Sequence, residues 1–379
     1  MAEQTTYAAS PARLMVIGVG GGGGNAVDRM FSSNNRVVEL VVANTDAQVL
    51  EIVRGHRTLQ LGRKLTAGLG AGGNPEIGRL AAEESREVII DLLNGVDMVF
   101  ITAGMGGGTG TGAAPVIAAI AKEAGILTTA IVTRPFSFEG LARAEKAESG
   151  IARLAQSVDA LICISNDKLL KVAPSDTPIT KAFEIADEVL RQGVEGISDL
   201  ITIPGMINLD FADIESVMRD AGTAMMGIGE GTGDGKMKEA ARNAISSPLL
   251  DGSIHGARKV IMNITGGSDL TLDEVTAAAS LIREAVSDKA DIIFGTAIRE
   301  GMESVRLTVI ATGFSVDYGR KEEEGQPLSN DSMLAKLEQE SRVGVDDFDI
   351  PTFLRRSRRS REEPPRPPWG DPRSDDRRK

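Results

Sequence analysis

A glycine-rich segment, GGGTGTG at Gly106–Gly112, could bind the phosphates of a ligand. Glycine adopts positive φ easily and has no side chain, so successive backbone N–H groups can converge on one anion. The apolar run VDMVFI precedes the segment, and the helix-like run APVIAAIAKEA follows it. A helix amino terminus adds free N–H groups and partial positive charge. A flexible hinge would need neither flanking element, so the sequence predicts a phosphate-binding loop.

Two further glycine-rich segments precede predicted helices. The first is GVGGGGGNAV at 18–27, within and after an apolar run, and the second is TAGLGAGGNPEIG at 66–78. Three such segments indicate a ligand with several phosphate contacts. The motif GxxxxGK[ST] is absent, and the two main segments hold no lysine. Backbone N–H groups, a metal and an arginine elsewhere must therefore offset the phosphate charge.

The segment at 18–27 also fits a dinucleotide-binding motif. Gly18, Gly20 and Gly23 match GxGxxG, and Glu39 lies about twenty residues further on, where such a fold places an acid for the ribose. The motif is weakly specific when it stands alone. An NAD-dependent enzyme is therefore an alternative at this point.

A pair of carboxylates, Asp210 and Asp213, lies in the segment NLDFADI at 208–214. Their i,i+3 spacing places both on one face at the start of a helix. Aspartate in a first turn commonly caps a helix, which is one interpretation. The same pair could orient a water molecule, a task for which the phosphate-binding segments hold no evident residue. Both interpretations stay open on the residues alone.

Apolar strands that alternate with helices must position these residues. Short apolar runs lie at 14–18, 38–43, 97–102, 128–133 and 160–165. The helix expected from Glu76 has its apolar stripe at Ile77, Leu80, Val88 and Leu92, and the one from Glu139 has it at Leu141, Ala144, Ile151 and Leu154. This alternation predicts an α/β fold, with a parallel sheet covered on both faces.

A longer helix is expected at about 180–200, where the 3.6-residue period continues for several turns. Its apolar positions are Phe183, Leu190, Val194, Ile197 and Ile201. Strands expected at 259–265, 291–298 and 305–312 follow, together with a helix that Thr271 and Glu274 begin as a capping box. These elements predict a second, smaller α/β domain.

Composition and charge exclude several classes of protein. The 379 residues carry a formal net charge of −12, which argues against non-specific nucleic-acid binding. The single cysteine, Cys163, excludes an internal disulfide, and its apolar surroundings predict a small buried hydrophobe. His56 and His255 lie far apart in the sequence and are expected at the surface or in loops, not at a zinc site. We expect no signal peptide, because the opening stretch MAEQTTYAASPAR has no apolar core. We expect no membrane insertion, because no apolar run reaches about 18 residues.

The composition changes after Gly319. The final stretch, 355–379, is rich in Pro and Arg and holds ten Lys or Arg against five Asp or Glu, a net charge of +5. Such a composition predicts a disordered tail. A basic tail on an acidic body indicates a separate partner for the tail.

Several motifs in the same order resemble the tubulin/FtsZ family, and specifically the bacterial cell-division GTPases of the FtsZ kind. They are GVGGGGGNAV (18–27), ANTDAQ (43–48), GGGTGTG (106–112), TRPFSFEG (133–140), ISNDKLL (164–170) and NLDFADI (208–214). The similarity runs from about Leu14 to Tyr318 and resumes at Asp347. It implies a GTPase that forms head-to-tail filaments in the bacterial cytoplasm and builds the division (Z) ring at mid-cell, on the inner face of the membrane.

The resemblance implies a role for each matching residue. GTP or GDP, with Mg²⁺ held mainly by the phosphates and water, would be bound by Gly20, Gly21, Gly22, Asn25, Asn44, Asp46, Ala71, Gly72, Gly104, Gly106, Gly107, Gly108, Thr109, Gly110, Thr133, Pro135, Glu139, Arg143, Asn166, Phe183 and Asp187. Within this set, Glu139 and Arg143 would reach the ribose and phosphates, while Asn166, Phe183 and Asp187 would form the guanine site. Phe183 could equally be a core residue on its helical spacing alone. Asp210 and Asp213 would orient the attacking water in the site of the neighbouring subunit, with Asn208 shaping their loop.

The resemblance also divides the chain. It implies a flexible N-terminus (1–12), a GTP-binding domain (13–178), a central helix (179–203), a C-terminal GTPase-activating domain (204–318), a linker (319–346), a partner-binding peptide (347–356) and a basic disordered tail (357–379). The peptide DIPTFLRR, Asp349–Arg356, would bind membrane tethers and regulators of the FtsA, SepF or ZipA kind. A non-catalytic polymer adaptor is a third possibility, against which the Asp210/Asp213 pair argues.

Overall fold

The computed structural model describes residues 12–32, 38–53, 56–170, 174, 176–203, 207, 209–247, 249–250, 252–287, 289–299 and 301–314. Asn208 and the predicted linker, partner-binding peptide and basic tail lie outside these residues. The predictions made for them therefore stay predictions.

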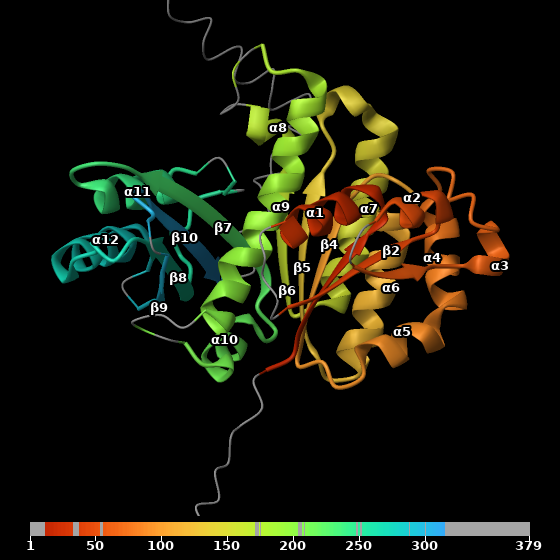
Figure 1. Ribbon diagram of the computed structural model, residues 1–379, viewed down its shortest axis with the longest axis horizontal. Helices are drawn as coiled ribbons and strands as arrows, with labels where there is room; N and C mark the ends of the chain where they lie inside the picture. The colour runs from red at the N-terminus through yellow and green to blue at the C-terminus, as the bar shows by residue number, and fades with distance from the viewer. Residues whose placement is uncertain are drawn as a thin grey trace, which may run out of the picture. The chain divides into compact units, whose positions relative to one another are not determined.

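The strands form one sheet of ten, in the order β3-β2-β1-β4-β5-β6-β7-β10-β8-β9 (Figure 1). Their bounds are β1 Leu14–Val19, β2 Glu39–Asn44, β3 Arg57–Gln60, β4 Met98–Gly104, β5 Leu127–Arg134, β6 Ala160–Ser165, β7 Gly222–Gly231, β8 Lys259–Gly266, β9 Asp291–Ile298 and β10 Val305–Thr312. Strands β1 to β7 pair in parallel, and β10 runs antiparallel to both of its neighbours, β7 and β8. The predicted α/β fold and every predicted strand are confirmed.

The helices are α1 Gly20–Ser32, α2 Ala47–Ile52, α3 Arg63–Thr66, α4 Pro75–Glu84, α5 Arg86–Leu93, α6 Thr109–Glu123, α7 Leu141–Ser157, α8 Asn166–Leu170, α9 Ile179–Thr202, α10 Phe211–Met218, α11 Lys236–Ile245 and α12 Leu272–Ala285. A short 3₁₀ helix, Ser137–Glu139, precedes α7. Thr271 and Glu274 form the predicted capping box of α12.

Helices cover both faces of the parallel strands, as the continuous apolar runs predict. In β1 the side chains alternate, because successive residues of a strand point to opposite faces. Met15 and Ile17 join a core with α4 to α7, whereas Leu14 and Val16 join a core with α1, α9 and α10. The loops at the strand ends are thereby held between two packed layers.

Two glycines let the long helix α9 lie close to both halves of the sheet. A Cβ on Gly193 would lie 3.1 Å from Ile131 of β5, and one on Gly196 would lie 2.8 Å from Thr308 of β10. Glycine usually weakens a helix interior. Here the missing side chains allow α9 to pack against β5 and β10 together (Figure 1).

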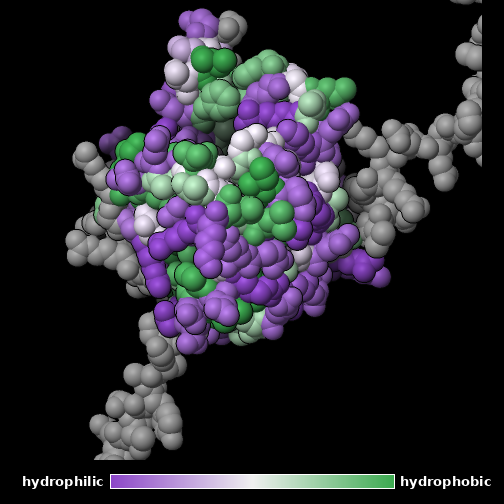
Figure 2. Space-filling model, turned by 90° about the vertical axis from the view of Figure 1, so that its right-hand side faces the viewer, coloured by the Kyte–Doolittle hydropathy of each residue, from purple (hydrophilic) through white to green (hydrophobic). Residues whose placement is uncertain are grey.

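The apolar stripe predicted from Glu76 is wrong in part. The helix breaks at Ser85 into α4 and α5, and Leu80 and Val88 are exposed. The buried face consists instead of small residues such as Ala81 and Ala82, because α4 packs tightly on α6. Figure 2 shows this side of the molecule, where apolar groups interrupt a mainly hydrophilic surface. The prediction that Leu141 is a stripe residue of α7 also fails, since this side chain is 74% exposed at the first helical position.

The sequence analysis did not predict β7. Its glycines alternate, and a Cβ on Gly227, Gly229 or Gly231 would lie within 2.2 Å of a backbone carbonyl oxygen of α11. This period of two is the signal that could have revealed a strand lying directly against a helix. His56 was expected at the surface or in a loop; it lies in the loop before β3, but its imidazole is fully buried, edge-on against Phe31.

Candidate active site

In the strand order β3-β2-β1-β4-β5-β6, the chain crosses the sheet in one direction from β1 to β3 and in the opposite direction from β4 to β6. The sheet therefore has a topological switch point between β1 and β4. The chain leaves β1 toward β2 on one side and leaves β4 toward β5 on the other. In open α/β sheets, ligands bind outside the carboxyl ends of the strands at such a switch point. The two main glycine-rich segments directly follow β1 and β4, so both open onto this position.

The three glycine-rich segments pack against one another. A Cβ on Gly20 would lie 3.0 Å from the Gly110 nitrogen, and one on Gly108 would lie 2.8 Å from the Ala71 Cβ. In contrast, the positions where a Cβ would stand on Gly21, Gly72 and Gly107 face open space. The segments therefore form one surface, on which backbone groups are accessible because no side chains cover them.

Free N–H groups line this surface. Helix α1 begins at Gly20, and α6 begins after Gly108, which provides no side-chain cap. The first N–H groups of a helix have no intrahelical partner, and the helix dipole adds positive charge there. Gly20 and Gly106 have φ values of 74° and 101°, which glycine adopts without strain. The arrangement suits an anionic ligand such as a chain of phosphates.

Asn44 and Asp46 shape the loop after β2. The Asn44 Oδ1 accepts the N–H groups of Thr45 and Asp46, at 2.8 and 3.3 Å. The Asp46 carboxylate accepts the Gln48 N–H at 3.0 Å and caps α2. Among the residues that the structure describes, no group of three or more His, Cys, Asp or Glu side chains could hold a metal ion.

Glu139 and Arg143 lie beside the second main glycine segment. Their side chains form an ion pair at 3.1 Å, and Glu139 also accepts the Phe136 N–H at 2.8 Å. A Cβ on Gly106 would lie 2.7 Å from the Arg143 Cγ, so the arginine stem runs along this segment, and the side chain as a whole is half exposed. Thr133 is buried next to it, and its carbonyl accepts the Met105 N–H at 2.9 Å.

The predicted base site contains an unsatisfied buried polar atom. Asn166 is 5% exposed, and its Oδ1 has no hydrogen-bond partner. A buried polar atom without a partner is costly, so the atom is poised for a ligand donor. Phe183 is 40% exposed and lies edge-on to Phe136 at 5.3 Å. Its exposure disfavours the alternative that Phe183 is a core residue.

Asp187 connects α9 with α1. Burial raises the pKa of Asp187 to about 6, although the nearby Arg29 and a hydrogen bond with Asn25 oppose this shift. The Arg29 Nε lies 3.8 Å from the Asp187 Oδ2. Arg29 was missed by the sequence analysis. Its spacing of four residues from Asn25 on α1 was the available signal, because residues four apart share a helix face.

Glu39, the candidate ribose acid of an NAD enzyme, lies at the wrong end of the sheet. It begins β2, opposite Met15, whereas the glycine segments follow the other ends of these strands. Glu39 forms an ion pair with Arg57 at 3.0 Å. The dinucleotide alternative therefore lacks its acid.

Asp210 and Asp213, like Glu39, lie near the amino ends of the parallel strands, away from the glycine segments. Helix α10 is held there through Arg219, directly after it, whose guanidinium lies 3.3 Å from the buried Asp159 that precedes β6. Asp159 in turn accepts the N–H of Thr128, near the start of β5. Within one chain, the aspartates and the glycine segments thus occupy opposite ends of the parallel strands.

The two aspartates cap α10 reciprocally. Asp210 accepts the Asp213 N–H at 2.8 Å, and Asp213 accepts the Asp210 N–H at 3.2 Å. The capping interpretation is therefore correct for the single chain. Each carboxylate has a further oxygen, and Asp210 is exposed, so capping leaves both able to orient a ligand or water.

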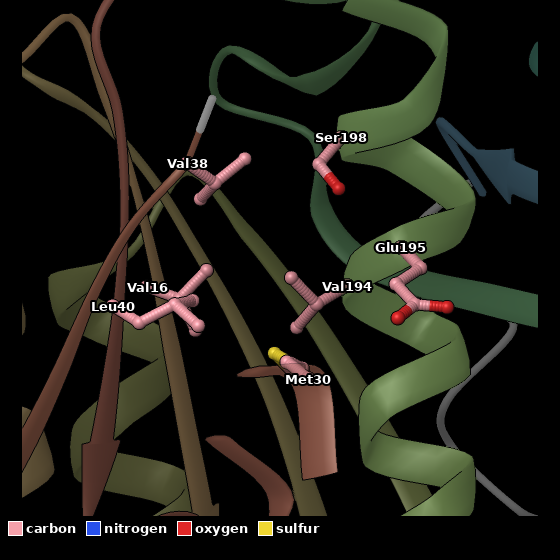
Figure 3. A pocket seen from close by; sticks show the side chains of 7 residues that line it. All are labelled: Val16, Met30, Val38, Leu40, Val194, Glu195 and Ser198. Carbon is pink, nitrogen blue, oxygen red and sulfur yellow. The ribbon is translucent and has the colours of Figure 1, made fainter. Parts of the chain in front are cut away.

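A pocket elsewhere contains none of the predicted site residues. It lies between α9, α1 and the first two strands, and its lining is Val16, Met30, Val38, Leu40, Val194, Glu195 and Ser198 (Figure 3). Val194 points from α9 toward the apolar residues of the strands. The Glu195 carboxylate is paired with Arg191.

Comparison with known proteins defines the class. Residues 13–174 match the family model of the tubulin/FtsZ GTPase domain, and residues 222–315 match that of the FtsZ C-terminal domain. The structure is similar to an empty FtsZ dimer from M. jannaschii, with a TM-score of 0.77 and 44% identity over 80% of this chain and 89% of that one. CetZ1 of Haloferax volcanii, a GDP-bound monomer, shares the fold at 21% identity and a TM-score of 0.69, over 86% of this chain and 99% of its own.

Fold, site and matched domains define a GTPase of the tubulin-like cytoskeletal class associated with cell division. Within that class, the chain belongs to the FtsZ family. The NAD-enzyme alternative is thereby wrong. The more specific resemblance to bacterial members stays a prediction, because the matching FtsZ structure comes from M. jannaschii. No helix in the described part of the chain is both long and apolar enough to cross a membrane.

Proposed function

We propose that this chain binds GTP with Mg²⁺ at the β1–β4 switch point and assembles head to tail, so that Asp210 and Asp213 of one copy complete the site of the next. Two sets of residues, which we call half-sites, support this proposal by their separation within one chain: the glycine segments with the base-site residues form one, and the Asp210/Asp213 pair forms the other. Helix α9 alone has 24 residues and a length of roughly 36 Å at about 1.5 Å per residue. Because Asp187 and the aspartate-bearing α10 lie toward opposite ends of that span, one chain cannot bring both half-sites to one nucleotide. A contact between such unlike surfaces is heterologous, and it produces an open filament when its rotation does not close a ring.

Each half-site would contribute different chemistry. The N–H groups of Gly20–Gly22 and Gly107–Gly110 would hold the phosphates, while the Gly106 N–H donates to the Thr111 hydroxyl at 2.8 Å and shapes the loop. Arg143 would add positive charge. Asp187 and Asn166 would bind the guanine edge, with Phe183 against the base. Magnesium, when bound with the nucleotide, would neutralise phosphate charge. Phosphoryl transfer depends on positioning and electrostatics, so the neighbour's aspartates would act by orienting and polarising one water molecule.

Light scattering and phosphate release, measured together at increasing protein concentration, test this function. GTP should produce assembly and hydrolysis, whereas GDP and NADH should produce neither. Turnover per subunit should rise with concentration, because a lone subunit has only half a site. A non-catalytic adaptor would assemble without phosphate release, and equal activity in dilute monomer and polymer would contradict the shared site.

Guanine-nucleotide binding should weaken in acid. Burial raises the pKa of Asp187 to about 6, so below that pH the free protein holds a proton that guanine recognition must expel. By linkage, the affinity for GDP should fall about tenfold for each pH unit below 6 and level off above 7. Titrations at pH 5 to 8 measure this dependence. The phosphates also titrate, so the same series with Asp187→Ala is the control, and an equal slope in that variant would exclude Asp187 as the titrating group.

The C-terminal peptide should connect filaments to a membrane tether. In FDIPTFLRR, the residues Phe348, Ile350, Phe353 and Leu354 supply apolar groups that can dock on a partner, and Arg355 and Arg356 can meet acidic groups. Deleting 347–379 should leave GTP turnover near normal and abolish co-sedimentation with vesicles that carry an FtsA- or SepF-like tether. Deleting only 357–379 is the matched control. Retained co-sedimentation after the larger deletion would contradict this role, and with it recruitment to the inner membrane face at mid-cell.

A further inference from the structure

Thr45, in the loop after β2, contacts two of the three glycine-rich segments at the candidate phosphate site. Its side chain is fully buried, and its hydroxyl lies 2.7 Å from the hydroxyl of Thr109, the first residue of α6. Its backbone carbonyl accepts the Thr66 hydroxyl at 3.2 Å and the Gly70 N–H at 3.3 Å. Thr45 thus contacts the segment at 66–78 through its backbone and the segment at 106–112 through its side chain.

The hydroxyl-bearing side chains of Thr45 and Thr109 differ in their exposure and in their hydrogen-bond partners. Thr109 is half-buried at the edge of the surface formed by the glycine segments, whereas Thr45 lies behind it without exposure. Among the hydrogen bonds of the described residues, the Thr45 hydroxyl takes part only in the one with Thr109. A hydroxyl has one proton to donate and lone pairs that accept. If Thr109 donates its proton to a phosphate oxygen, it can accept the Thr45 proton in return.

We propose that Thr45 is a positioning residue that orients and polarises the Thr109 hydroxyl toward the nucleotide phosphates. The inference rests on the proposed binding of guanine nucleotide at this site. A donor behind Thr109 fixes the direction of its O–H bond, and successive hydrogen bonds of this kind strengthen one another. Thr45 itself does not touch the ligand. The sequence analysis selected its neighbours Asn44 and Asp46, because only the fold reveals the contact with Thr109.

Three variants separate this role from a structural one. Thr45→Val keeps the branched shape and removes the hydroxyl, whereas Thr45→Ser keeps the hydroxyl. Thr109→Val removes the partner. GDP is the probe, because it avoids hydrolysis, and titration of the full chain below its assembly concentration gives the dissociation constant. Thermal unfolding without nucleotide reports any general loss of stability.

Thr45→Val should weaken GDP binding about 3–10-fold, the range expected for one lost hydrogen bond, and Thr45→Ser should stay within about twofold of wild type. The double variant with Thr109→Val should bind no more weakly than Thr109→Val alone, because Thr45 acts through Thr109. Unchanged affinity in Thr45→Val, failure of Thr45→Ser to restore binding, or additive losses in the double variant would overturn the inference. If wild type binds no GDP, the proposed function itself is wrong.

Discussion

Asp213→Ala is expected to bind GTP normally, assemble, and hydrolyse GTP about 10²–10⁴-fold more slowly, the usual cost of losing a group that activates the attacking water. The expectation follows from the position of Asp213 at the end of the strands opposite the glycine segments, where it cannot touch its own chain's nucleotide. The filaments should persist, because GTP is not consumed. Phosphate release and light scattering measure both effects, and hydrolysis at the wild-type rate would contradict the proposal.

Capping is the competing explanation, because Asp213 accepts the Asp210 N–H. Asp213→Asn separates the two roles, since its amide oxygen can still accept that N–H but the negative charge is lost. Slow hydrolysis in both variants would indicate a catalytic role. Normal hydrolysis in Asp213→Asn, with a loss only in Asp213→Ala, would indicate that capping alone matters.

Mixing experiments test whether the site is shared between subunits. A wild-type subunit whose nucleotide faces an Asp213→Ala neighbour should be inactive, so turnover per wild-type subunit should fall as the variant fraction rises. Gly108→Trp should destroy the phosphate site, because even a Cβ there would lie 2.8 Å from the Ala71 Cβ. This second variant retains intact aspartates. Mixed with Asp213→Ala, it should restore some hydrolysis if it enters the filament, and turnover that depends only on each subunit's own aspartates would exclude a shared site.

Asp187→Ala is expected to weaken GTP binding by the cost of unpaired guanine donors at a desolvated site, roughly 1–3 kcal/mol, or about 5–150-fold. The guanine N1–H and amino group would lose their acceptor, while Arg29 and Asn25 would lose the carboxylate that connects α1 to α9. ATP binding, which has no use for this acceptor, should change little. Titrations with both nucleotides measure the change in preference.

Glu184→Ala is the matched control on the same helix. Glu184 lies one turn earlier on α9, and its carboxylate forms an exposed ion pair with Lys181 at 3.0 Å. Its removal should leave GTP affinity unchanged, because an exposed pair contributes little. Equal losses in Asp187→Ala and Glu184→Ala would reflect damage to α9, and unaltered GTP affinity in Asp187→Ala would exclude Asp187 from guanine recognition.

The sequence by itself determined the features that depend on residue type over short distances. Glycine-rich segments between apolar strands and helices predicted a phosphate site, because the backbone freedom they require is a local property. Runs of apolar residues predicted the strands for the same reason, since a strand buried on both faces needs little polarity. The family motifs added candidate roles for residues such as Asn166 and Asp187, which stay predictions until tested.

Only the tertiary structure decided which distant segments meet. Arg29 approaches Asp187 because α1 packs on α9, and Thr45 meets Thr109 because β2 and β4 flank β1. Glu39, correctly spaced in the sequence, begins its strand at the end away from the glycine segments. The same strand direction places Asp210 and Asp213 far from those segments. Spacing along a chain does not specify strand order or direction, and these decide which half of the site another subunit must supply.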